Sequence, residues 1–111
     1  MSDYTFLSLT QANDEKHKYV ATFKNNKTNR NKSVKFGAYG MGDFIYYNEK
    51  EGVEVAKKKK KAYIARHIAL NEDYNNPLTA GWWAMNLLWS RPTFQASYEY
   101  CLKLLKKQGY L

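Results

Sequence analysis

The sequence predicts an α+β fold, with a small, mostly antiparallel sheet of three to four strands in the N-terminal half and three helices after it. Residues 1–47 contain runs in which apolar and polar side chains alternate, with many aromatic and β-branched residues, as in half-buried strands. Residues 53–107 instead repeat apolar side chains at the spacing of a helix. At 111 residues the chain has the size of one domain, so we expect residues 1–111 to fold as a single unit.

Three segments of the N-terminal half carry the alternating pattern. The first two are separated by a turn-like stretch, which favours a hairpin with a longer loop, and residues 25–31 form a polar loop. In the third segment Val34 and Phe36 fall on one side of the strand. Several glycines then precede a run with the composition of a fourth strand. The strands are expected at residues 4–9, 18–24 and 33–38, with a possible fourth at residues 43–47.

Two helices are expected in the first part of the helical region. The first covers residues 53 to about 70, where an acidic, asparagine-rich stretch interrupts the apolar pattern. The second has Asn76 as its N-cap and Pro77 in its first position. It ends at Ser90, because Pro92 disfavours helical geometry in the residue before it.

A third helix is expected to begin at the cap residue Thr93. Lys106 and Lys107 fall in its last turn, where cations interact favourably with the helix dipole, and Gly109 suits its C-terminal cap. Its apolar stripe consists of Phe94, Tyr98, Cys101 and Leu105.

Positive charge is concentrated in the second half of the chain. The protein contains 18 Lys and Arg against 10 Asp and Glu, a formal net charge of +8. Residues 1–56 hold eight basic and seven acidic side chains, whereas residues 57–111 hold ten and three. This imbalance favours polyanions or acidic protein surfaces as partners.

Two basic runs are the candidate sites for a polyanion or an acidic partner. Five consecutive lysines surround at least one turn of the first helix, and a second run within residues 24–35 would project from a hairpin turn. Either run could neutralise phosphates, and the lysine run could instead be a nuclear-import signal. An ordinary solvated surface is the alternative for both. The candidate residues are Lys57, Lys58, Lys59, Lys60, Lys61, Lys27, Arg30 and Lys32.

The second helix carries all three tryptophans of the chain. Trp82, Met85 and Trp89 share one stripe and Trp83 lies on an adjacent stripe, so the apolar face is wide. Part of this face is expected to pack in the core. Because Trp is a common anchor at protein interfaces, we expect the remainder, and hence these tryptophans, to contact a partner protein.

No residue pattern indicates an enzyme, a cofactor or a metal site. Walker, G-x-G-x-x-G, G-x-S-x-G and H-E-x-x-H motifs are absent from the sequence, and its histidines and single cysteine lack the spacing of metal ligands. We expect Arg66 to form a structural ion pair with Glu72 or Asp73. His67 is expected to be a packed side chain, and Cys101 a buried and inert thiol. The sequence therefore predicts a non-enzymatic binding protein.

Several short motifs occur together in the middle of the chain. They are YIARH at residues 63–67, NED at 71–73, NNPLTAG at 75–81, LLW at 87–89 and PT at 92–93. This combination resembles a family of small basic proteins of unassigned activity found in nucleocytoplasmic large DNA viruses, such as chlorella viruses and iridoviruses. Over residues 17–107 the resemblance includes the strand segments. Family members carry a Ser-Arg pair in the tryptophan helix where this chain has Ala84, Met85 and Asn86, and the strand at residues 4–9 is additional.

The resemblance implies a viral origin and a place in the virion, and it supplies no catalytic residues. We therefore expect a virion structural protein, namely a minor capsid protein on the inner face of the icosahedral shell, assembled in the infected host cell. Its expected partners are viral capsid proteins, together with the DNA backbone or the inner membrane surface, and no small-molecule substrate. The alternative is a sequence-independent DNA-binding packaging or nucleoid protein, whose affinity for DNA would fall steeply with salt.

Overall fold

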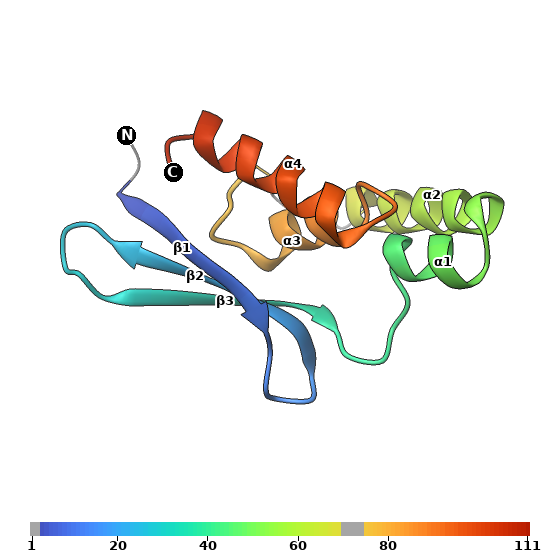
Figure 1. Ribbon diagram of the computed structural model, residues 1–111, viewed down its shortest axis with the longest axis horizontal. Helices are drawn as coiled ribbons and strands as arrows, with labels where there is room; N and C mark the ends of the chain where they lie inside the picture. The colour runs from blue at the N-terminus through green and yellow to red at the C-terminus, as the bar shows by residue number, and fades with distance from the viewer. Residues whose placement is uncertain (1–2, 70–74) are drawn as a thin grey trace.

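The computed structural model describes residues 3–69 and 75–111. Within these residues a three-stranded sheet precedes the helices (Figure 1). The later helices lie over one face of the sheet and leave the other face open, whereas the first two helices lie beyond the end of the sheet. The predicted α+β class and the order of strands and helices are confirmed. The elements are β1 (Tyr4–Gln11), β2 (His17–Asn25), β3 (Asn31–Ala38), α1 (Phe44–Lys50), α2 (Val53–Ala69), α3 (Ala80–Trp83), the π-helical turn η1 (Ala84–Leu88) and α4 (Phe94–Lys107).

The sheet is antiparallel, in the order β1-β2-β3, and confirms the three predicted strands. Phe6 of β1 lies opposite Phe23 of β2, and Ala21 of β2 lies opposite Val34 of β3. A register shift after Phe6 marks a bulge in β1. Because side chains alternate along a strand, the apolar set faces the helices and the polar set faces solvent.

Trp83 lies at the centre of the core, between the sheet and the helices. Its ring centroid is 5.6 Å from that of Phe6, 6.2 Å from that of Phe23 and 5.5 Å from that of Phe36. Its indole Nε1–H donates a hydrogen bond of 2.8 Å to the carbonyl of Pro77. The tryptophan segment thus packs directly on the covered face of the sheet.

Residues 43–47, predicted as a possible fourth strand, begin helix α1 instead. The Asp43 carboxylate accepts a hydrogen bond of 2.9 Å from the backbone N–H of Tyr46 and so caps this helix. At Gly42 an added Cβ would lie 2.6 Å from Cζ of Tyr47, so a larger residue at this position would require the Tyr47 ring to shift. The strand-like composition was therefore overridden by a cap and by tertiary packing.

The second predicted helix begins one turn later than expected. Asn76 does not cap it, because the Asn76 side chain and carbonyl accept hydrogen bonds from Leu78 and Thr79 and close a turn. Thr79 is the N-cap of α3, with its hydroxyl 3.4 Å from the backbone nitrogen of Trp82. The backbone then widens into η1. The prediction of Asn76 as the N-cap was wrong, although the segment is helical.

Helix α4 confirms both predicted caps. The Thr93 hydroxyl accepts a hydrogen bond of 3.2 Å from the backbone N–H of Ala96. At the other end Gly109 has a φ of 87°, and the N–H of Tyr110 donates to the carbonyl of Leu105 at 2.8 Å, as in a Schellman motif. The remaining expected helix is α2, which covers the predicted range as far as Ala69, while Leu70 lies outside the described residues.

Candidate functional site

The three tryptophans are buried, which corrects the prediction that they contact a partner. Trp82, Trp83 and Trp89 are 1%, 0% and 7% exposed. Trp89 stacks on the ring of Tyr63 with centroids 4.5 Å apart, so it joins η1 to α2. The physical reason is that a three-stranded sheet with one covered face needs large side chains to fill its core, and this helical segment supplies them.

The lysine run on α2 is mostly exposed. Lys57, Lys58, Lys59 and Lys61 face solvent and form no ion pair with a carboxylate among the residues that the structure describes. Lys60 differs, because its Nζ lies 3.2 Å from the carbonyl oxygen of Ser90 and is half-buried. Burial lowers the pKa of Lys60, with a smaller contribution from nearby positive charge. We call the four exposed residues the α2 lysine cluster.

The second predicted basic run lies at the tip of the β2–β3 hairpin. Lys27, Arg30 and Lys32 are exposed there. Lys27 has a carboxylate neighbour, Asp3, at a distance of 3.9 Å, but both side chains are largely exposed. Contacts of this kind contribute little to stability, so all three cations are available to a ligand.

Two further lysines belong to the same end of the molecule. The Phe6 N–H of β1 donates to the carbonyl of Tyr110 at 2.8 Å, which holds the end of α4 beside the start of β1 (Figure 1). The start of β1 in turn lies beside the hairpin, since the backbone N–H of Asn26 donates to the carbonyl of Asp3 at 2.8 Å. Lys106 and Lys107 are exposed on this end of α4. Sequence reasoning assigned them only to the helix dipole, because their neighbourhood depends on tertiary structure.

The hairpin cluster, defined as Lys27, Arg30, Lys32, Lys106 and Lys107, lies far from the α2 lysine cluster. Figure 1 shows the β2–β3 loop at one end of the long axis and the α2 lysine segment toward the other. The principal extents of the molecule are 45 × 27 × 26 Å. The two predicted basic runs therefore do not form one surface.

A cleft of about 470 Å³ lies between the end of β3, helix α2 and η1. Within it Lys18 Nζ lies 2.6 Å from the Asp43 carboxylate, and both side chains are largely buried. The same carboxylate caps α1, so its two oxygens are both engaged. This ion pair ties β2 to α1, and its geometry is that of a structural contact.

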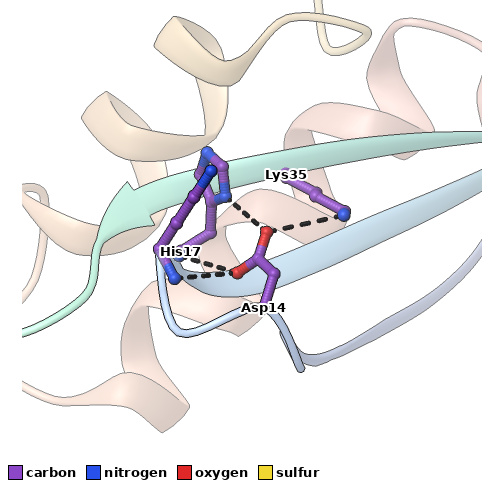
Figure 2. Close-up of polar contacts among 4 residues, drawn as sticks. Asp14, His17 and Lys35 are labelled. Atoms are coloured by element: carbon purple, nitrogen blue, oxygen red, sulfur yellow. Dashed lines mark hydrogen bonds and ion pairs between the residues drawn. The ribbon is translucent and has the colours of Figure 1, made fainter.

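Asp14, in the turn between β1 and β2, gathers a second polar network (Figure 2). One carboxylate oxygen accepts hydrogen bonds from the backbone N–H groups of Lys16 and His17 at 3.0 and 2.9 Å. The other lies 2.8 Å from His17 Nδ1 and 3.4 Å from Lys35 Nζ. The hydrogen bonds from His17, and then from Lys16, hold the pKa of Asp14 well below its usual range.

The remaining candidates for chemistry do not assemble into a site. Cys101 is buried, as predicted, and desolvation raises the pKa of its thiol to about 12, which makes the thiolate scarce. The ring of His67 packs on that of Tyr63, with centroids 4.0 Å apart. The expected partners of Arg66, residues 72 and 73, lie outside the described part of the chain.

Residues 3–69 and 75–111 contain neither a cluster of metal-ligand side chains nor a helix that could span a membrane. Across these ranges no group of three or more His, Cys, Asp or Glu side chains is placed to hold a metal ion. None of the helices in the same ranges combines the length and the apolar character needed to cross a bilayer.

In comparisons with protein-family models, curated proteins and solved structures, no match to this chain was found.

Proposed function

We propose that this protein binds duplex DNA without reading its sequence, by contacting phosphates with its exposed lysines. The observation that carries the proposal is the α2 lysine cluster, four solvent-facing cations on one helix without a described carboxylate partner. Lysine neutralises phosphate as a point charge and releases the counterions that the duplex had condensed. The hairpin cluster offers five more cations of the same kind.

The composition of these surfaces favours phosphate over an acidic protein. Eight of the nine cluster residues are lysine and one is arginine. Protein interfaces are enriched in arginine and aromatic residues and depleted in lysine, because lysine is strongly hydrated and flexible. The aromatic side chains that would anchor a protein partner, the three tryptophans, are in the core.

The test is the salt dependence of binding to two unrelated duplexes of equal length. We expect equal affinities for the two sequences and a logarithmic decrease in affinity with salt, with a slope of about −0.9 for each phosphate contacted. A variant in which the α2 lysine cluster and Lys27, Arg30 and Lys32 are all changed to Gln should lose binding. A control with Lys16→Gln and Lys35→Gln, two exposed lysines outside both clusters, should keep it. Undetectable or salt-insensitive binding by the unmodified protein would exclude the proposal.

A minor capsid protein is the second candidate, and an apolar surface groove favours it. The groove, of about 590 Å³, lies between α1, the start of α2 and the start of α4. Val53 and Phe94 line it and are 55% and 37% exposed. Exposed apolar side chains that line a common groove are typical of a protein contact. With the tryptophans buried, this groove would carry the contact with a capsid protein in the virion that the resemblance implies.

Purified virions decide whether the second candidate holds. Stoichiometric presence of the protein in shells whose DNA has been removed by nuclease would support it. Loss of the protein from shells when Val53→Asp and Phe94→Asp are combined would place the contact in the groove. Absence of the protein from virions would exclude the capsid role.

A further inference from the structure

The excess positive charge of the protein lies at its two ends. The α2 lysine cluster and the hairpin cluster together contain nine of the 18 basic residues, and among the residues that the structure describes the other nine basic side chains are accompanied by eight acidic ones. The rest of the protein is therefore close to electrically balanced. A duplex that lies along the body between the ends would meet little attraction there, whereas each end is attractive by itself.

The shape of the fold keeps these two charged ends apart. The hairpin tip and the α2 lysine segment lie toward opposite ends of the long axis, with the core between them (Figure 1). The stacked rings of Trp89 and Tyr63 fix α2 to η1, and the Lys18–Asp43 ion pair fixes α1 to the sheet. Duplex DNA is stiff, with a persistence length of about 150 base pairs, so a segment that crosses one end at an angle to the long axis cannot bend around the body to reach the other end.

We propose that one molecule bridges two segments of duplex DNA, with one segment at the α2 lysine cluster and the other at the hairpin cluster. This inference rests on the proposed function and adds to it, since a protein that only coats DNA would need a single charged face. Bridging by a monomer would hold separate DNA segments together, because a molecule bound to one segment by one charged end still presents its other end to a second segment.

The experiment uses a duplex immobilised on beads and a second, fluorescently labelled duplex in solution. In one variant Lys57, Lys58, Lys59 and Lys61 are changed to Gln. In the other variant Lys27, Arg30, Lys32 and Lys107 are changed to Gln. Each variant loses four charges, so the two have the same net charge and serve as controls for each other.

We expect the unmodified protein to retain the labelled duplex on the beads. Each variant should still bind the immobilised duplex, with an affinity reduced about two-fold because one of two independent sites is lost. Capture of the labelled duplex by each variant should fall about ten-fold or more, since the single remaining end holds only one segment. An equimolar mixture of the two variants should not restore capture, because no molecule in it has both ends.

Three results would overturn bridging by a monomer. If either variant still captures the second duplex, self-association joins the segments instead. If either variant no longer binds the immobilised duplex, the two ends form one composite site. If the unmodified protein binds one duplex but captures no second one, bridging is absent while the proposed DNA binding stands. Failure of the unmodified protein to bind any duplex would reject the proposed function itself.

Discussion

The tryptophan segment, residues 80–89, and the lysine helix α2 are close in the sequence, but the first is largely buried and the second largely exposed. Residues 80–89 place five large side chains in the core, among them all three indoles. Helix α2 is longer but buries only Ala56 and Tyr63. Both segments suggested contact surfaces from composition, and only the lysine helix exposes the side chains concerned. The difference shows that excess aromatic residues in a small domain are first required by its own core.

The contrast has a geometric cause. The sheet has three strands and only one face covered by helices, so a few side chains must fill the space between the two layers. Trp83 reaches three phenylalanines of the sheet at once. Helix α2 packs on α1 and, through Tyr63, on Trp89 just after η1. It buries only Ala56 and Tyr63, so most of its circumference is free to carry charge.

The largest effect is expected from Trp83→Ala, which tests whether the tryptophan segment is core. Removing a fully buried indole with four ring neighbours should lower the free energy of unfolding by about 3–5 kcal/mol. Urea denaturation followed by circular dichroism measures this loss. A control, Tyr39→Ala, removes an aromatic ring that is 66% exposed and should change stability by no more than about 0.5 kcal/mol. Equal effects of the two substitutions would contradict the assignment of Trp83 to the core.

Disruption of the Lys18–Asp43 ion pair should have the next largest effect, because it joins the sheet to the helical layer. Asp43→Asn keeps a side chain that can cap α1 but loses the charge, and it should cost about 2 kcal/mol. Asp43→Ala also removes the cap and should cost about 1 kcal/mol more. Thermal or urea unfolding of both variants measures the two contributions. If the two variants are equally stable, the cap contributes nothing.

The features that were predicted correctly are those that depend on the local pattern of the sequence. Alternation located three strands and the buried faces of Val34 and Phe36, and local hydrogen-bond chemistry located the caps at Thr93 and Gly109. These features were predictable because each depends on residues close together in the chain.

The features that sequence reasoning missed depend on long-range contacts. Helix α1 was taken for a strand because its aromatic residues favour strands, whereas its cap, Asp43, is held by Lys18 from β2. The position of Asn76 before Pro77 suited an N-cap, but the Trp83 indole donates a hydrogen bond to the Pro77 carbonyl and so helps to hold this segment as a turn. Lys107 reaches the hairpin end only because α4 lies against β1. The sequence showed that the tryptophan segment has a wide apolar face, but it did not show that the protein's own sheet covers this face.

A smaller, pH-dependent effect is expected at Asp14, which lies in the turn between β1 and β2, outside both the tryptophan segment and helix α2. Its pKa is lowered in the folded protein from an ordinary value of 3.8, chiefly by the hydrogen bond with His17. The stability that this provides is complete above pH 3.8 and is lost as the pH falls through the folded-state pKa. At neutral pH the free energy of unfolding of Asp14→Asn should therefore be lower than that of the unmodified protein, and this difference should shrink in acid. Glu15→Gln, which removes a neighbouring charge, should show no such convergence.

The smallest effect on stability is expected from changing the α2 lysine cluster to Gln, and this prediction separates surface from core most directly. Lys57 and Lys61 are four residues apart on one helix, and relief of their repulsion should stabilise it by about 0.2–0.5 kcal/mol. Capture of a second duplex should nevertheless be lost.

Lys60→Gln is the matched control within the same run, because Lys60 Nζ contacts the Ser90 carbonyl and lies 4.8 Å from the Phe44 ring centroid. It should lower stability by about 1 kcal/mol and leave capture unchanged. If Lys60 affected capture as strongly as its neighbours, total charge and not the exposed surface would control binding.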